Sequence, residues 1–253
     1  MRLHVLASGS SGNALVVETQ DGAVLFDCGL GPRVLARRLA QVGVAPEQIR
    51  ALVLSHEHTD HVKGLPAFRK RFWVPVLATA GTWDALGGID GMGELMALGK
   101  PVQVADLQVL PVPVSHDAVE PAGFVVQGGS VRVGILTDTG VVTELLMERF
   151  SGCHALFLEA NHDLDMLRFG PYPEVLKQRI ASRHGHLSNA QARQALERLV
   201  HPGLRHVVAM HLSRENNRPA LVQQALGSIL RGGGVSLAVA SQDEPLSVEL
   251  EEP

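Results

Sequence analysis

Four side chains able to bind a metal ion lie within six consecutive positions, as His56, His58, Asp60 and His61 in the run Ser55-His56-Glu57-His58-Thr59-Asp60-His61. Clustered imidazoles repel one another when protonated and must give up hydration when neutral, so a cation best explains their gathering inside a fold. Imidazole and carboxylate groups are ligands of zinc and of other divalent transition metals. The run therefore predicts a metal site.

Three further polar residues occur where a predicted strand ends. His116 follows the apolar residues 112–114, Asp138 follows 131–136, and His211 follows 207–210. Each residue taken alone is more often structural than functional. The repeated setting, an apolar strand entering a polar turn, indicates that they converge on one pocket.

The elements that position these residues alternate along the chain. Residues 51–54, just before the histidine-rich run, form a short apolar segment typical of a buried strand. We predict further strands over 3–7, 14–19, 23–27, 76–78, 102–104, 107–114, 123–126, 131–136, 155–158, 206–210 and 235–238. We predict helices over 32–42, 62–72, 141–150, 174–182, 189–200 and 219–230, with a partly helical, glycine-interrupted stretch over 82–98. This order predicts an α/β protein of one domain, residues 1–253, in which two sheets lie between helices.

Composition describes an ordinary globular chain, with 45% hydrophobic and 19% charged residues. No stretch approaches the ~18 apolar residues of a membrane span, and no leader-like segment opens the chain. Cys28 and Cys153 lie far apart without a CxxC pairing, so we expect free thiols in a reducing compartment, the cytoplasm.

The charge is unevenly spread. The net charge is −4, but five acidic residues and no basic ones follow Ser241, which leaves 21 acidic against 22 basic residues before it. A local basic face is possible, and a global one is not. One basic and aromatic cluster, Arg69-Lys70-Arg71-Phe72-Trp73, could contact a phosphate backbone and stack a base. The alternative, a solvated helix end with one anchored aromatic residue, stays open.

The first predicted connection, Ser8-Gly9-Ser10-Ser11-Gly12-Asn13, is small, polar and flexible. Its backbone amides could approach an anion closely, so Ser10 and Asn13 are candidate substrate contacts. It could equally be a simple connector between strands.

The H-x-H-x-D-H motif, followed in order by His116, Asp138 and His211, resembles the metallo-β-lactamase superfamily. The resemblance implies a four-layer αββα sandwich with two divalent metal ions per chain. It assigns His56, His58 and His116 to one metal, and Asp60, His61 and His211 to the other. Asp138 would bridge the two, and Asp27 would support the loop from behind. A ligand set of nitrogen and oxygen atoms accepts Zn²⁺ or Mn²⁺ and suits hydrolysis by a metal-activated hydroxide, which Asp60 would orient or deprotonate.

Four strings are also similar to the YycJ/WalJ-like subfamily, which is associated with a metal-dependent 5′-to-3′ exonuclease acting on DNA. They are Ser8–Asn13, Glu159–Asp163, Gly185–Asn189 and His211–Asn217. The resemblance implies a nucleic-acid substrate, with DNA preferred to RNA, no membrane, and no obligate protein partner. The oligomeric state, the native metal and the polarity of digestion stay open.

His186 is the candidate for proton transfer to the leaving group. Ser188 and Gln191 have the spacing of a capping box, which predicts a helix that starts just after His186. The positive field of a helix N-terminus favours a phosphate group there. Phosphodiesterases of this superfamily, such as the tRNA 3′-end endonuclease, carry a similar histidine that contacts the scissile phosphate. A capping motif with an incidental histidine is the alternative.

Only 73 positions separate Asp138 from His211, and predicted elements already fill them. We therefore expect no inserted cap domain and an open groove edged by loops. The basic residues nearest to the site in sequence are Arg168, Arg183, Arg214 and Arg218. Arg214 is the preferred phosphate contact because it follows His211 closely, and Asn161, His162 and Asn217 are weaker candidates for orienting substrate.

Two other functions would use the same metal ligands. A small-molecule hydrolase of the same fold could act on a cyclic phosphate, a lactone or a thioester. A metal-stabilised binding protein without catalysis is the second alternative.

Overall fold

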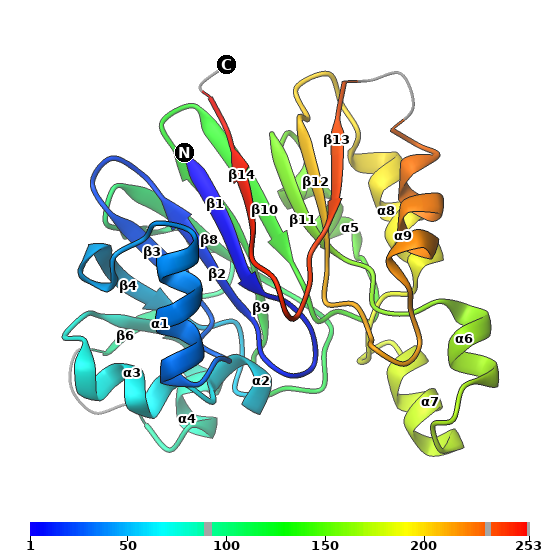
Figure 1. The fold of residues 1–253 in the computed structure, drawn as a ribbon, viewed down its shortest axis with the longest axis horizontal. Helices are drawn as coiled ribbons and strands as arrows, with labels where there is room; N and C mark the ends of the chain where they lie inside the picture. Colours follow the sequence, from blue (N-terminus) through cyan, green and yellow to red (C-terminus); the bar gives the residue numbers. More distant parts are fainter. Residues whose placement is uncertain (89–92, 231–233, 252–253) are drawn as a thin grey trace.

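The computed structural model describes residues 1–88, 93–230 and 234–251 of the chain, and in these residues two seven-stranded sheets face each other (Figure 1). The first sheet has the order β14-β1-β2-β3-β4-β5-β6. Its strands are β1 (Arg2–Ala7), β2 (Ala14–Glu18), β3 (Ala23–Phe26), β4 (Ile49–Val53), β5 (Val76–Thr79), β6 (Gly93–Met96) and β14 (Leu246–Glu249).

The second sheet has the order β13-β12-β11-β10-β9-β8-β7. Its strands are β7 (Val102–Val104), β8 (Leu107–Pro113), β9 (Ala122–Gly128), β10 (Val131–Leu136), β11 (Ala155–Glu159), β12 (His206–Met210) and β13 (Ser236–Val239). Strands β10, β11, β12 and β13 run parallel, as do β3, β4, β5 and β6 in the first sheet.

Helices cover the outer face of each sheet (Figure 1). On the first sheet these are α1 (Pro32–Gln41), α2 (Thr59–Val62), α3 (Leu65–Arg71) and α4 (Ala80–Ala85), with the 3-10 turn η1 (Pro46–Gln48). On the second sheet they are α5 (Glu144–Phe150), α8 (Asn189–Leu199) and α9 (Pro219–Gly227). Two more helices, α6 (Leu164–Phe169) and α7 (Glu174–Ala181), extend from the edge of the second sheet. The architecture confirms the predicted αββα sandwich.

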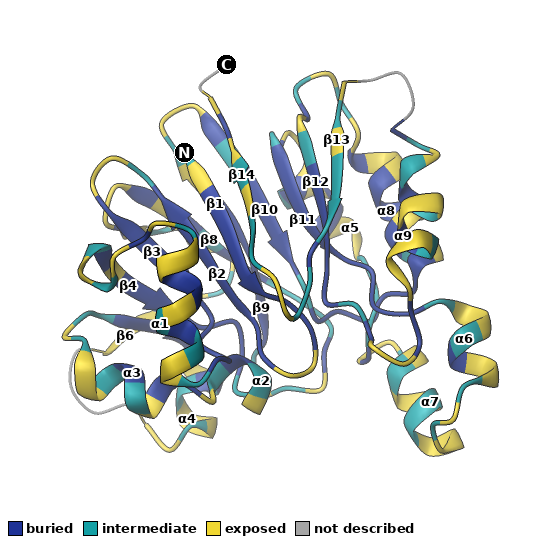
Figure 2. Ribbon diagram, viewed as in Figure 1, coloured by how far each residue is buried: buried dark blue, intermediate teal, exposed yellow. Residues whose placement is uncertain are grey.

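The alternation of side chains along the strands produces this layering. In β4, Ala51 and Val53 point into the space between the sheets, whereas Leu52 faces the outer helices. Both directions are apolar, because each sheet is buried on both faces (Figure 2). Phe26 and Phe124 meet between the two sheets with ring centroids 5.3 Å apart, so the central layer joins both halves.

The parallel strands determine where chemistry can occur. The carboxyl ends of parallel neighbours meet at one edge of a sheet. Asp27 follows β3 and His56 lies just beyond β4, while Asp138 and His211 follow β10 and β12. Because the two sheets present these ends on the same side, residues distant in sequence are brought together.

Some predicted elements differ in the structure. The predicted helix over 62–72 is divided into α2 and α3 at Gly64, which lies so close to Leu30 that a side chain there would overlap its carbonyl. The stretch over 82–98 is the short helix α4 and the strand β6, with 89–92 outside the described residues. Helix α6 and strand β14 were not predicted. Strand β14 is formed by the acidic tail, which pairs with the edge of β1 and is therefore set by a partner 240-odd positions away.

No helix in the described ranges is both long and apolar enough to span a membrane.

We expect Gly29→Ala to destabilise the protein by about 1–3 kcal/mol, because overpacking forces the backbone to shift. A methyl group there would overlap the carbonyl of Asp60 and lie 2.6 Å from the amide nitrogen of Asn13. Gly31→Ala is the matched control, since its added carbon meets nothing within 4 Å. Urea denaturation followed by circular dichroism measures both. Equal unfolding midpoints for the two variants would contradict this account of the loop.

Candidate metal centre

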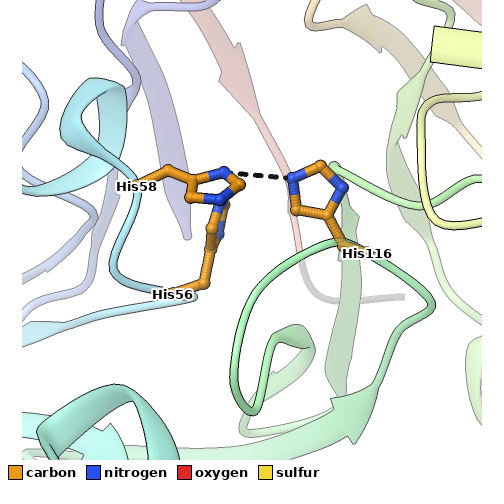
Figure 3. A group of neighbouring side chains, drawn as sticks. All are labelled: His56, His58 and His116. Atoms are coloured by element: carbon orange, nitrogen blue, oxygen red, sulfur yellow. Dashed lines mark hydrogen bonds between the residues drawn. The ribbon is translucent and has the colours of Figure 1, made fainter. Parts of the chain in front are cut away.

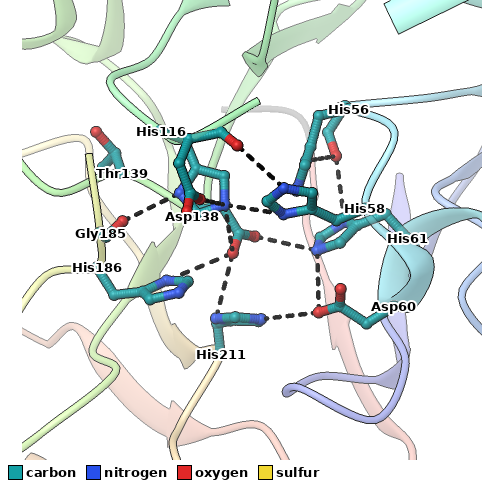
Figure 4. Close-up of polar contacts among 12 residues, drawn as sticks. His56, His58, Asp60, His61, His116, Asp138, Thr139, Gly185, His186 and His211 are labelled. Carbon is teal, nitrogen blue, oxygen red and sulfur yellow. Dashed lines mark hydrogen bonds and ion pairs between the residues drawn. The ribbon is translucent and has the colours of Figure 1, made fainter. Parts of the chain in front are cut away.

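Segments that follow four strands bring the predicted ligands together (Figure 4). His56 and His58 lie on the loop between β4 and α2, where His58 is the residue that precedes the helix. His116 follows β8, Asp138 follows β10 and His211 follows β12. Their ligating atoms, with those of Asp60 and His61, fall into overlapping groups within which all atoms lie within 4.8 Å of one another.

The first group is His56, His58 and His116 (Figure 3). The Nδ1 atom of His58 faces the Nε2 atom of His116 at 3.2 Å, with the ring of His56 beside them. The remaining ring nitrogens are held by the protein, since His58 and His116 donate to the carbonyls of Asp117 (3.2 Å) and Gly185 (3.1 Å). The inward-facing nitrogens are thereby left as electron-pair donors directed at one point, as metal-binding imidazoles require.

The second group is Asp60, His61 and His211. The Nε2 atoms of His61 and His211 lie 3.5 and 3.6 Å from Oδ2 of Asp60. The other nitrogen of His61 donates to Asp27 at 2.7 Å. Asp27 also accepts hydrogen bonds from the amide and hydroxyl of Ser55, so one buried carboxylate holds both the ring and the loop. The structure thus places Asp27 behind the ligands, where the resemblance implies it.

Asp138 lies between the two groups. Its Oδ2 atom is 3.2 Å from Nε2 of His61, and its Oδ1 atom is 3.9 Å from Nε2 of His116. The carboxylate is 3% exposed, too buried for water to solvate it fully. It is therefore in the position from which one carboxylate can serve two cations.

Buried atoms without partners test whether the residues fit metal ions. In the described residues, the buried side-chain atoms without a hydrogen-bond partner include Nε2 of His56, Oδ2 of Asp138 and Nε2 of His211, beside atoms of other residues such as His162 and Asn216. Leaving a buried polar atom unsatisfied costs about 1–3 kcal/mol each. The first three atoms belong to the predicted ligand set and point into the same region, so the donor set fits divalent cations.

Three residues of the site have strained backbones. Asp27, Asp138 and His211 have φ angles of 60°, 55° and 56°, in the left-handed region that L-residues seldom adopt. Each lies one or two residues beyond the end of a parallel strand, at the edge of the sheet where the site forms. Such strain persists where the surroundings enforce it, and it concentrates at functional sites.

In the polypeptide alone, the buried histidines and carboxylates of the site shift one another's pKa values. Burial disfavours the charged form of His211, but the charge of Asp138 and the nearby carboxylates of Asp60 and Glu159 outweigh it and raise its pKa to about 10. Burial likewise opposes protonation of His61, and the charges of Asp27 and Asp138 raise its pKa well above the usual range. Burial and the charge of His61 lower the pKa of His56. In the polypeptide alone, the imidazoles nearest the carboxylates, those of His61 and His211, are therefore the ones that hold protons.

Glu159 is a site residue to which the sequence assigned no role. It ends β11 and is fully buried, and its Oε1 atom accepts a hydrogen bond from Nδ1 of His186 at 2.7 Å. Its Oε2 atom accepts from the amides of Thr139 (2.9 Å) and Leu187 (3.2 Å). Its position at a strand end, like that of Asp138, was the available signal.

Glu159, Asp138, His186 and His211 form a further group that could hold a metal. However, both oxygens of Glu159 already accept hydrogen bonds from the protein. By contrast, Nε2 of His56, Oδ2 of Asp138 and Nε2 of His211 have no hydrogen-bond partner. The geometry therefore favours Glu159 as the group that orients His186.

His186 lies beside the centre. Its ring stacks against that of His211 at 5.1 Å between centroids and remains partly exposed, with 19% of the side chain accessible. Ser188 caps α8 through the amide of Gln191, and Gln191 completes the capping box. The structure thus places His186 just before a helix N-terminus, with one ring nitrogen fixed by Glu159.

The predicted substrate contacts are placed unevenly. Ser10 is exposed on the loop after β1, and Asn13 is buried with its amide 3.3 Å from Oδ2 of Asp60. Arg214 is exposed and pairs with Asp243 at 3.0 Å. An exposed pair of this kind contributes little and leaves the guanidinium able to exchange partners.

The other three candidates, Asn161, His162 and Asn217, are buried. Asn161 donates to the carbonyl of His211 at 2.8 Å, and Asn217 donates to the carbonyl of Ala160 at 2.8 Å. His162 is 1% exposed, and burial lowers its pKa to about 4. In the described residues neither ring nitrogen of His162 has a hydrogen-bond partner, whereas Asn161 and Asn217 bond to the protein. Contact of all three with substrate remains a prediction.

Comparison with known proteins agrees with this geometry. The family model described as the beta-lactamase superfamily domain matches residues 23–212. The chain is 33% identical to exodeoxyribonuclease YycJ of Bacillus anthracis over 96% of both chains. It is also 33% identical to exodeoxyribonuclease WalJ of Streptococcus pneumoniae serotype 2, over 93% of this chain and 90% of that protein.

Among solved structures, the metallo-beta-lactamase fold protein YhfI from Bacillus subtilis superposes with a TM-score of 0.75 at 15% identity. The match covers 98% of both chains, so the prediction of no large inserted domain is confirmed. At this identity the likeness concerns the fold alone. From the family match and the full-length relatives, the chain belongs to the metallo-β-lactamase superfamily and, within it, to the YycJ/WalJ family.

Proposed function

We propose that this protein is a two-metal phosphodiesterase that degrades nucleic acid, acting on DNA as a 5′-to-3′ exonuclease. The observation that carries the choice of substrate is the 33% identity, over 96% of both chains, to a protein named exodeoxyribonuclease. The buried histidine and carboxylate groups support the metal dependence independently.

The residues present would hold two divalent cations. His56, His58 and His116 would bind one, while Asp60, His61 and His211 would bind the other. Asp138 would contact both. Such ions lower the pKa of water and neutralise the negative charge that develops on a transferring phosphoryl group. The nitrogen and oxygen donors suit Zn²⁺ or Mn²⁺.

The chain's own groups would manage the protons. Asp60 is partly exposed, and its carboxylate is held ionised because the nearby rings of His211 and His61 lower its pKa despite burial. The ionised carboxylate can orient an attacking water by accepting its hydrogen bond, whereas the lowered pKa makes it a weak acceptor of the proton itself. His186, with Nδ1 fixed by Glu159, presents Nε2 toward a substrate phosphate and can protonate the leaving oxygen.

The cysteines support the proposal of a cytoplasmic location. Cys28 and Cys153 are both buried and free. Burial raises their thiol pKa values to about 12 and about 11, which keeps both protonated and unreactive. Free thiols of this kind suit a reducing compartment.

We expect the metal-loaded protein to release labelled mononucleotides from 5′-end-labelled DNA at the earliest times. Single- and double-stranded DNA and RNA, digested with Mn²⁺ and then Zn²⁺ and with a chelator control, give the polarity and the preference. Hydrolysis of bis(p-nitrophenyl) phosphate without cleavage of any labelled nucleic acid would instead indicate a small-molecule hydrolase.

Metal binding should release protons. At neutral pH the raised pKa values of His61 and His211 keep both rings protonated in the polypeptide alone, and coordination must displace those protons. We expect release of about two protons per chain near pH 7, and an affinity that increases as the pH rises toward about 10, the pKa of His211. Isothermal titration calorimetry in buffers of different ionisation enthalpy measures the protons. An affinity independent of pH would contradict the assignment of these ligands.

His186→Ala should reduce kcat on a nucleic-acid substrate by about 10²–10⁴-fold, the usual contribution of a general acid. Metal content, measured by mass spectrometry, should stay at the wild-type value because His186 is outside the proposed ligand set. His184→Ala is the matched control, since this exposed histidine lies two residues away and contacts Ser115 instead. Full activity of His186→Ala would remove this residue from the mechanism.

A further inference from the structure

The helical layer over the first sheet carries a charge opposite to that of the whole chain. Between Cys28 and Pro75 the sequence contains eight Lys or Arg residues and three Asp or Glu residues. The complete chain has a net charge of −4, so positive charge is concentrated in this segment. The segment includes α1, α2 and α3, which cover the outer face of the first sheet (Figure 2).

The exposed members of this layer form what we call the basic face: Arg33 and Arg37 of α1, Lys63 after α2, Lys70 and Arg71 of α3, and Trp73. In the described part of the chain, the Arg–carboxylate pairs involve other arginines, namely Arg2, Arg38, Arg179, Arg193, Arg198 and Arg214. The cations of the basic face are thus not neutralised by neighbouring carboxylates. They are available to bind an anionic partner.

Trp73 adds an aromatic surface to these charges. Its side chain is 85% exposed, although Leu65 and Phe68 of the preceding helix are buried. The apolar side of α3 is therefore packed against the core, and Trp73 is not required to complete it. An exposed indole next to basic residues is the combination that stacks nucleobases while cations hold the phosphates.

The basic face is attached directly to the metal centre. The amide of Cys28 donates to the carbonyl of His61 (2.7 Å), and the amide of Gly64 donates to the carbonyl of Cys28 (2.7 Å). Lys63 lies between His61 and Gly64 in the sequence, and its ammonium group donates to the carbonyl of Ser11 at 3.2 Å. Beyond Lys63, α3 leads away toward Trp73, and its seven residues, Leu65–Arg71, span about 10 Å at 1.5 Å per residue.

We propose that the basic face binds the single-stranded continuation of the nucleic-acid substrate beyond the metal centre. Its lysines and arginines contact the phosphates, and a base stacks on Trp73. The proposal rests on the proposed function, because it takes nucleic acid as the substrate.

An anionic membrane is the other polyanion that could bind such a surface. A helix that lies in a membrane interface exposes a row of apolar side chains. On α1 and α3 those side chains, such as Leu35, Leu39 and Phe68, are buried against the protein. Trp73 is the large hydrophobic residue that the described part of this layer exposes. The observations favour nucleic acid.

The test uses the metal-loaded protein and single-stranded phosphorothioate DNA, with affinity measured by fluorescence anisotropy. Arg37→Glu/Lys70→Glu should weaken binding of an oligomer of about 16 nucleotides by roughly tenfold or more and reduce the salt dependence by about 0.7 per lost contact. Trp73→Ala should weaken it roughly fivefold or more, and Trp73→Phe should restore most of the loss. A mononucleotide should bind equally well to every variant, because one nucleotide at the metal centre does not extend along α3 to Trp73.

The matched control is Arg193→Glu/Arg205→Glu, which makes the same change in net charge elsewhere. Arg193 lies on α8, in the opposite helical layer, and Arg205 lies at the far end of β12 from His211. The control should bind the long oligomer as the wild type does. Equal losses in both double variants, or unchanged binding in the basic-face variants, would overturn the proposal. So would wild-type binding to vesicles of anionic phospholipid, lost in the same variants, without binding to DNA.

Failure of the proposed function gives a different result. Hydrolysis of bis(p-nitrophenyl) phosphate reports the metal centre alone and should be the same in every variant. If no nucleic acid is cleaved but the basic-face variants lose DNA binding, the basic face stands and the exonuclease assignment fails. If DNA is cleaved and its binding does not depend on the basic face, the exonuclease assignment stands and the basic-face proposal fails.

Discussion

The buried carboxylate of Asp138 imposes the constraint on which the site depends. It is withdrawn from water between two groups of imidazoles, and a charge in such a place must be paired. In the polypeptide alone, protonated His61 and His211 supply the opposite charge. Divalent ions would supply it more completely, because they also take up the unpartnered atoms of His56 and His211.

The fold makes this concentration of polar groups possible at the edge of an apolar sandwich. The layers between the sheets and beneath the helices are almost wholly hydrophobic, and this packing holds the strand ends in place. The left-handed turns at Asp27, Asp138 and His211 then direct three side chains into one site. Supporting groups, among them Ser55 and Glu159, fix the orientation of the rings.

The sequence predicted the sandwich and most strands, because apolar runs separated by turns depend mainly on local pattern. It also indicated all seven candidate ligands, since their residue types and strand-end positions are visible in one dimension. Strand β14 was not predicted, because it forms by pairing with β1 at the other end of the chain. Glu159 received no role because its contacts with His186 and Thr139 come from separate loops. The direction of Asn161 and Asn217 toward the protein likewise depends on three-dimensional packing.

The central claim is that two metal ions occupy this site on either side of Asp138. Anomalous diffraction from crystals grown with Mn²⁺ tests it most directly. The account predicts two anomalous peaks per chain, one bound by His56, His58 and His116 and the other by Asp60, His61 and His211. A single peak, or a second peak bound by Glu159 and His186 in place of Asp60 and His61, would contradict it.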